Sequence, residues 1–167
     1  MPIGRRLLLA TGIGAAIAAK ARGAWAAVLG DGGRDSLRAL APFLDTLIPS
    51  DSISGSATDL GIEKQLTALS ATRPHYERLL VLGCGWLDSE ARKEGASDFA
   101  ALAPDMREAV VARAEAAPEN TPPWRFFQTV HLQAKIYYYG DPRSWPALGF
   151  DGPPQPIGFP DHDRPPE

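Results

Sequence analysis

The stretch from Trp124 to Tyr138 constrains the fold most, because its apolar residues recur at intervals of three and four. At this spacing successive side chains lie on one face of an α-helix. We therefore predict a helix that follows Pro122-Pro123 and runs to about Tyr139, with the richest apolar face in the chain. That face consists of Trp124, Phe127, Val130, His131, Ala134 and Tyr138.

Earlier segments repeat the helical pattern, and none reads as a convincing strand. One helix is expected over residues 37–48. Pro42 lies inside it, so the helix either kinks there or begins its regular part there. Thr58 or Asp59 can cap a second helix that runs on toward Leu69.

Two more helices are expected to begin at Pro74 and Pro104, since proline is well tolerated in a first helical turn. Gly83 and Gly85 interrupt the first of these. Each glycine costs roughly 0.5 to 1 kcal/mol relative to alanine in a helix interior. Close packing against a neighbouring helix is the expected reason for both glycines.

The predicted fold is all-α: one small domain of about five helices over residues 27–139, followed by a tail over residues 140–167. Eight of the 16 prolines follow Gly140, so we expect this tail to be extended. Chain ends are often unattached, and the tail can be such an end. Large apolar residues interrupt its prolines, however, which favours a strap that docks on this domain or on a partner.

The first 26 residues have the layout of a signal peptide. A basic start at Arg5 and Arg6 is followed by an apolar run over residues 7–19 and by the small residues Ala24 and Ala26 at a predicted cleavage site. The apolar run is about 13 residues long, whereas a membrane-spanning helix needs roughly 20. A cleaved signal is thus preferred over an uncleaved anchor.

The paired arginines favour the twin-arginine route, which exports folded proteins. Leu7 and Leu8 follow them directly, glycines and alanines dilute the apolar run, and Lys20 and Arg22 precede the cleavage site. Gly4 departs from this pattern, which usually has Ser or Thr there, and ordinary secretion remains the alternative. The expected location is the periplasm, including the periplasmic face of the inner membrane if a complex holds the chain there.

Charge and ligand chemistry exclude several classes of function. The formal net charge is −3, and removing the signal with its four basic residues would make it −7, without a basic stripe for nucleic acid. The single cysteine, Cys84, is expected to be a buried apolar residue, and it cannot hold an iron–sulfur cluster alone. There is neither a haem-attachment motif nor a dinucleotide loop after a strand. We expect no cofactor, metal or catalytic residue in this chain.

His131 is the one histidine placed on the aromatic face. His75 and His162 lie far from it in sequence, so no base and partner are brought together by spacing. A core or interface role is favoured for His131. The alternative is a self-sufficient periplasmic binding protein or enzyme that uses the aromatic face around this residue.

Two stretches resemble the gluconate 2-dehydrogenase subunit 3 family. The first runs from Leu44-Asp45-Thr46-Leu47-Ile48-Pro49 through Gly55-Ser56-Ala57 to Leu60-Gly61-Ile62, and reads Gly-Ser-Ala where the family has a glycine-alanine turn. The second, more specific stretch begins Tyr138-Tyr139-Gly140-Asp141-Pro142-Arg143-Ser144-Trp145 and continues to Asp161.

This resemblance implies a non-catalytic small subunit of a flavin-dependent dehydrogenase for sugars, sugar acids or polyols. In that family the large subunit is similar to glucose–methanol–choline (GMC) oxidoreductases and holds FAD, and a c-type cytochrome in a third subunit often accepts the electrons. The small subunit holds no cofactor and often supplies the twin-arginine signal that brings the complex to the translocase. The expected partner-facing residues are Trp124, Phe127, His131, Tyr138, Tyr139, Trp145, Phe150, Pro154 and Phe159.

Overall fold

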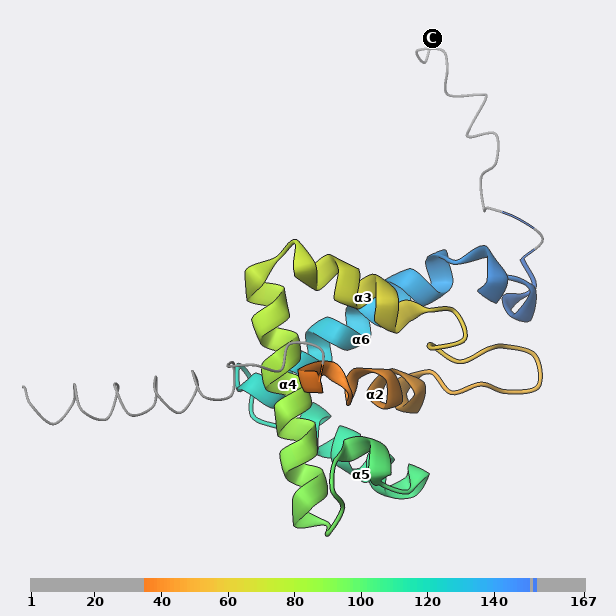
Figure 1. The fold of residues 1–167 in the computed structure, drawn as a ribbon. Helices are drawn as coiled ribbons and strands as arrows, with labels where there is room; N and C mark the ends of the chain where they lie inside the picture. Colours follow the sequence, from red (N-terminus) through yellow and green to blue (C-terminus); the bar gives the residue numbers. More distant parts are fainter. Residues whose placement is uncertain (1–34, 151, 153–167) are drawn as a thin grey trace, which may run out of the picture. The chain divides into compact units, whose positions relative to one another are not determined.

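The computed structural model describes residues 35–150 and 152. The chain divides into two units, residues 1–35 and 36–167, and nearly all described residues belong to the second. The described part contains five α-helices and four short 3-10 turns but no strand, which confirms the all-α prediction (Figure 1). In chain order they are η1 (Asp35–Leu37), α2 (Leu40–Leu47), α3 (Ile62–Ala71), α4 (Pro74–Lys93), η2 (Phe99–Ala101), α5 (Pro104–Glu115), α6 (Pro122–Gly140), η3 (Pro142–Ser144) and η4 (Pro146–Leu148).

The two longest helices, α4 and α6, pack against each other, and the other helices complete the domain around them. α3 contacts both, α5 contacts both from the other end, and α2 lies in the middle against α3, α5 and α6 (Figure 1). One cluster of buried apolar side chains joins all five helices. The core is therefore single, as expected for a domain of this size.

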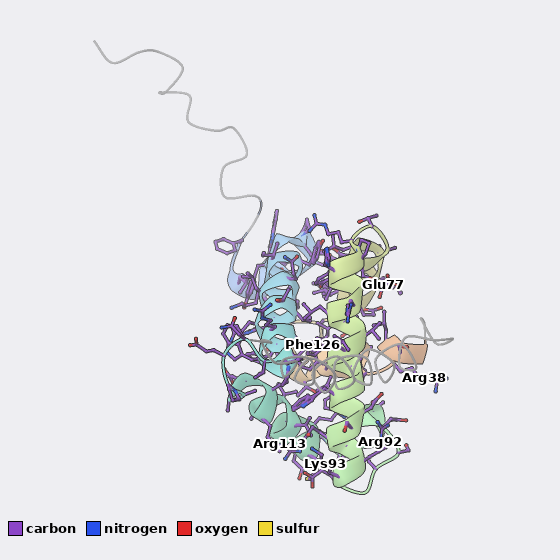
Figure 2. All side chains as sticks on the ribbon, turned by 90° about the vertical axis from the view of Figure 1, so that its left-hand side faces the viewer. Arg38, Glu77, Arg92, Lys93, Arg113 and Phe126 are labelled. Atoms are coloured by element: carbon purple, nitrogen blue, oxygen red, sulfur yellow. The ribbon has the colours of Figure 1, made fainter. Side chains whose placement is uncertain are left out.

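The closest packing in the core joins α4 to α6 at Gly83 and Phe126. A Cβ atom added to Gly83 would lie only 1.9 Å from Cδ2 of the Phe126 ring. That ring is fully buried, and its centroid lies 4.8 Å from the centroid of Phe43 on α2. Figure 2 shows Phe126 between α4 and α6. The close-packing explanation is thus confirmed for Gly83, where only glycine lets the ring approach the helix backbone.

The same explanation is wrong for Gly85, because nothing lies within 4 Å of the position its Cβ would take. Successive helical residues point about 100° apart, so two positions after Gly83 the helix surface has turned away from α6. Cys84 lies between the two glycines and is fully buried, as expected. Burial raises the pKa of its thiol, which keeps this cysteine in its neutral form.

Prolines start two helices as predicted, at Pro74 and Pro104, and α6 begins at Pro122 itself, within the proline pair that it was expected to follow. The regular part of the helix does not begin at Pro42. The helix begins two residues earlier, at Leu40, so Pro42 lies in its first turn, where the backbone N–H groups have no intrahelical acceptor. The proline therefore removes no intrahelical hydrogen bond at this position.

The predicted cap of α3 is also wrong. Gly61, in the left-handed region at φ 73°, precedes α3, and no side chain caps the helix. Thr58 is used elsewhere: its backbone N–H and its hydroxyl donate to the two carboxylate oxygens of Asp45 at 2.9 and 2.7 Å. The Asp59 carboxylate accepts from the backbone N–H of Ser56 at 2.8 Å. Both residues therefore shape the loop before the helix.

The tail after α6 is present, but its first part is folded into η3 and η4 instead of being extended. Each of these turns has a proline at its first position, where the fixed φ suits a 3-10 turn. Asp141 caps η3 by accepting the backbone N–H of Arg143 at 2.9 Å. Residues 153–167 lie outside the described part.

Candidate partner interface

The apolar stripe predicted on α6 is mostly core. Phe127 and Tyr138 are buried together with Val130 and Ala134, and Phe126, which the predicted stripe omitted, is buried as well. A buried side chain is not available to a partner. The interface prediction for Phe127 and Tyr138 is therefore replaced by a core role.

Two other residues of the stripe, Trp124 and His131, are only partly buried. The imidazole of His131 lies against the Phe127 ring, with centroids 5.3 Å apart. Partial burial lowers the pKa of His131, and the positive charge of Lys135 adds to this, while Glu115 on α5 opposes it.

A shallow depression of about 350 Å³ lies beside His131. Apart from His131 its lining residues are Gln128, Thr129, Leu132, Gln133 and Lys135, which include neither a carboxylate nor a thiol. Within the described residues, His131 forms no hydrogen bond to another side chain. The arrangement offers surface for contact and lacks the oriented acid–base pair that a hydrolytic site needs.

The opposite face of α6 carries a second apolar stripe, which the sequence analysis missed apart from Tyr139. Leu132, Ile136 and Tyr139 are each about half exposed. With 100° of rotation per residue, these three lie within about 60° of one another on the helix and roughly opposite the buried residues. We refer to Leu132, Ile136 and Tyr139 as the outward stripe.

A small apolar cleft continues the outward stripe beyond the end of α6. The cleft has a volume of about 200 Å³, and Tyr139 belongs to both features. The indole N–H of Trp145 donates to the backbone carbonyl of Tyr139 at 2.9 Å, which fixes the turn against the helix end. The lining residues are Tyr139, Trp145, Leu148, Phe150 and Gly152.

Gly149 directs the chain along this cleft. It has a left-handed φ of 74° and ends η4, after which the backbone N–H of Phe150 donates to the carbonyl of Trp145 at 3.0 Å. A residue with a Cβ would be strained at this φ. Leu148 and Phe150, on either side of the turn, are each about half exposed.

The turns after α6 are attached to the domain by polar contacts. The hydroxyl of Ser144, itself buried, donates to the carbonyl of Tyr138 at 2.7 Å. The guanidinium of Arg143 donates to the carbonyl of Leu60 at 2.7 Å and also pairs with Asp141, which lowers the pKa of that carboxyl. These hydrogen bonds fix the backbone of the turns, and the fixed backbone in turn positions the exposed side chains of the cleft.

Comparison with known proteins identifies the family. Residues 34–152 match the family model described as gluconate 2-dehydrogenase subunit 3. The chain belongs to this family. No curated protein and no solved structure matches the chain. Its family is thus that of a subunit of a dehydrogenase complex.

The two stretches that carry the subunit 3 resemblance lie in contact. The hydroxyl of Tyr138 donates to the carbonyl of Gly55 at 2.9 Å. The guanidinium of Arg143, in the second stretch, donates to the carbonyls of Asp59 and Leu60 in the first. Figure 1 shows the loop between α2 and α3 on the same side of the domain as η3 and η4. The family pattern therefore describes one structural junction between segments about 83 residues apart.

Several predicted residues lie outside the described part of this subunit 3 chain. They are Arg5, Arg6, Ala24, Ala26, Pro154 and Phe159. Within residues 35–150 and 152, no three His, Cys, Asp or Glu side chains come together in a group that could hold a metal ion. The helices of the same region are too short or too polar to cross a membrane.

Proposed function

We propose that this chain is a non-catalytic small subunit of an FAD-dependent, GMC-type dehydrogenase complex similar to gluconate 2-dehydrogenase. It assembles with the flavoprotein subunit and directs it through the twin-arginine translocase to the periplasm. A c-type cytochrome is the expected third component. The observation that carries the proposal is the family match over residues 34–152, which names a dehydrogenase subunit.

The distribution of exposed apolar residues supports a role in assembly. Six large apolar side chains in the described part are exposed, and five of them lie between residues 132 and 150. Scattered exposed apolar residues are ordinary on a soluble surface, whereas a contiguous group marks a contact site. The five are Leu132, Ile136, Tyr139, Leu148 and Phe150.

The export role has a physical requirement. A flavoprotein folds around its cofactor before export, so a partner without a signal must cross the membrane folded and bound to this chain. If transit takes minutes, the dissociation rate must be at most about 10⁻³ s⁻¹, which with an association rate near 10⁶ M⁻¹s⁻¹ gives a Kd of about 1 nM. Complexes of this stability usually bury at least about 1,200 Å².

The test replaces Arg5 and Arg6 by lysine in the full chain, co-expressed with the flavoprotein subunit from the same genome. We expect the dehydrogenase activity to shift from the periplasmic to the cytoplasmic fraction, while the two subunits still co-purify. Normal export of the activity would contradict the export role. Failure of the unchanged chain to co-purify with the flavoprotein would contradict the assembly role, and ligand-dependent melting of the isolated chain would support the alternative of a binding protein or enzyme around His131.

A further inference from the structure

No element in the described part of the chain covers the outward stripe. The charged residues of α6 around the stripe indicate which kind of partner binds there. The nineteen residues of α6 include two basic residues, Arg125 and Lys135, and no acidic residue, in a chain with a net charge of −3. By contrast, α3, α4 and α5 each carry acidic residues in their first turn. This helix is therefore a locally basic surface on an acidic protein.

Both basic residues are placed beside the outward stripe. By helical rotation Arg125 lies in line with Leu132, about two turns earlier, and Lys135 lies on the flank of the stripe beside Tyr139. Both side chains are exposed. Apolar residues in the middle with cations at the edge match a partner surface that is apolar at its centre and carries carboxylates at its rim.

We propose that the outward stripe, extended by Leu148 and Phe150, is the docking face for the flavoprotein subunit, on a surface with an apolar centre and an acidic rim. This inference rests on the proposed function and specifies the contact that it requires. The docking face is continuous along the helix and the turns after it, because Tyr139 belongs to the stripe and also lines the cleft with Leu148 and Phe150.

A second copy of this chain fits the same face poorly. A two-fold dimer must use the same patch on both copies. With antiparallel α6 helices crossing at the middle of the stripe, the two Lys135 side chains would meet near the axis. No carboxylate on α6 would offset this repulsion. The charges therefore favour a partner of different sequence.

The first experiment changes the apolar part of the face. The full chain with Leu132→Ser and Ile136→Ser is co-expressed with the flavoprotein subunit and compared with Ile53→Ser. Ile53 is the sixth exposed large apolar residue, and it lies on a loop that meets α6 through Tyr138, on the inward side. We expect co-purified flavoprotein to fall at least tenfold for the double variant and to stay unchanged for Ile53→Ser.

The second experiment reverses charge without changing apolar area. Lys135→Glu is compared with Lys64→Glu, since Lys64 is an exposed lysine on α3. We expect affinity to fall about tenfold for Lys135→Glu at low ionic strength, with the difference shrinking as salt is added, and little change for Lys64→Glu. Circular dichroism of each purified variant checks that the helices remain folded.

The outcomes separate this inference from the proposed function. If the unchanged chain fails to bind the flavoprotein, the proposed function is wrong. If it binds and the α6 variants bind equally well, only the docking face is wrong. Equal loss for Ile53→Ser, tighter binding of Lys135→Glu, or a dimer of the isolated chain that Lys135→Glu dissociates would each overturn the inference as well.

Discussion

The two faces of α6 are both apolar, yet they do different things. The inward face packs Phe126 against Gly83 and Phe43, whereas the outward stripe leaves Leu132, Ile136 and Tyr139 half exposed. Composition alone does not separate them. The difference lies in the neighbours: α2, α3, α4 and α5 all pack against α6, and no described element covers its outward stripe.

This contrast shows that apolar area stabilises a protein only where something covers it. Burial removes area from water and contributes about 25 cal/mol per Å², but an exposed side chain gains none of this until a partner arrives. Substitutions on the inward face should therefore lower the stability of the isolated chain. Substitutions on the outward stripe should spare stability and affect association instead.

The largest effect is expected for Phe126→Ala. The ring is fully buried, and its removal leaves a cavity between α2, α4 and α6, so the free energy of unfolding should fall by about 3 to 5 kcal/mol. Leu132→Ala is the matched control and should change stability by no more than about 0.5 kcal/mol. Urea denaturation of the two variants measures both values, and similar losses in the two would break the distinction between the faces.

A smaller loss is expected where a methyl group is added to the packed side of α4. Gly83→Ala forces a Cβ into the Phe126 ring and should cost about 1 to 3 kcal/mol. Gly85→Ala meets open space and should stabilise the protein by roughly 0.5 to 1 kcal/mol, because alanine is the better helix former. Thermal melting separates the pair, and a Gly83→Ala variant as stable as the unchanged protein would contradict the close approach of α4 and α6.

Much of the fold could be predicted from local sequence signals. Pro74, Pro104 and Pro122 mark helix starts because a proline lacks the N–H that a first helical turn leaves unpaired. Prediction from local sequence patterns failed where a side chain bonds to a residue distant in sequence. Thr58 could have capped α3 but bonds to Asp45, thirteen residues away, and this competition is invisible in a local pattern.

The candidate interface was harder to predict because α6 is apolar on two sides. Periodicity found the inward stripe, but it could not show that Phe127 and Tyr138 are buried while Leu132 and Ile136 are not. The spacing of 132, 136 and 139 was itself a signal of a second face. Among the tail residues, Trp145 and Phe150 line the cleft beside Tyr139, and whether they contact the partner stays a prediction.

A third comparison uses neighbouring tyrosines at the end of α6. The hydroxyl of Tyr138 donates to the carbonyl of Gly55, so Tyr138→Phe should cost about 1 kcal/mol in unfolding free energy. Tyr139 points to the outward side and is half exposed, so Tyr139→Phe should leave stability unchanged. Chemical denaturation of the two variants is the measurement, and an equal response would mean that the contact with the α2–α3 loop contributes nothing.

The smallest effect is expected at His131, which lies between the two faces. Partial burial and the charge of Lys135 lower its pKa in the folded chain, although Glu115 on α5 works against them.

Above the unfolded pKa of about 6.5, His131 is neutral in both the folded and the unfolded state, and stability is unaffected. As the pH falls below that value, the unfolded chain binds the proton first, so the folded state loses stability until its own lower pKa is passed. Between pH 7 and pH 5 the melting temperature of the unchanged protein should therefore fall relative to that of His131→Gln. If the melting temperature of the unchanged protein instead rises relative to that of His131→Gln as the pH falls, the attraction of Glu115 outweighs the effects of burial and Lys135 on the pKa of His131.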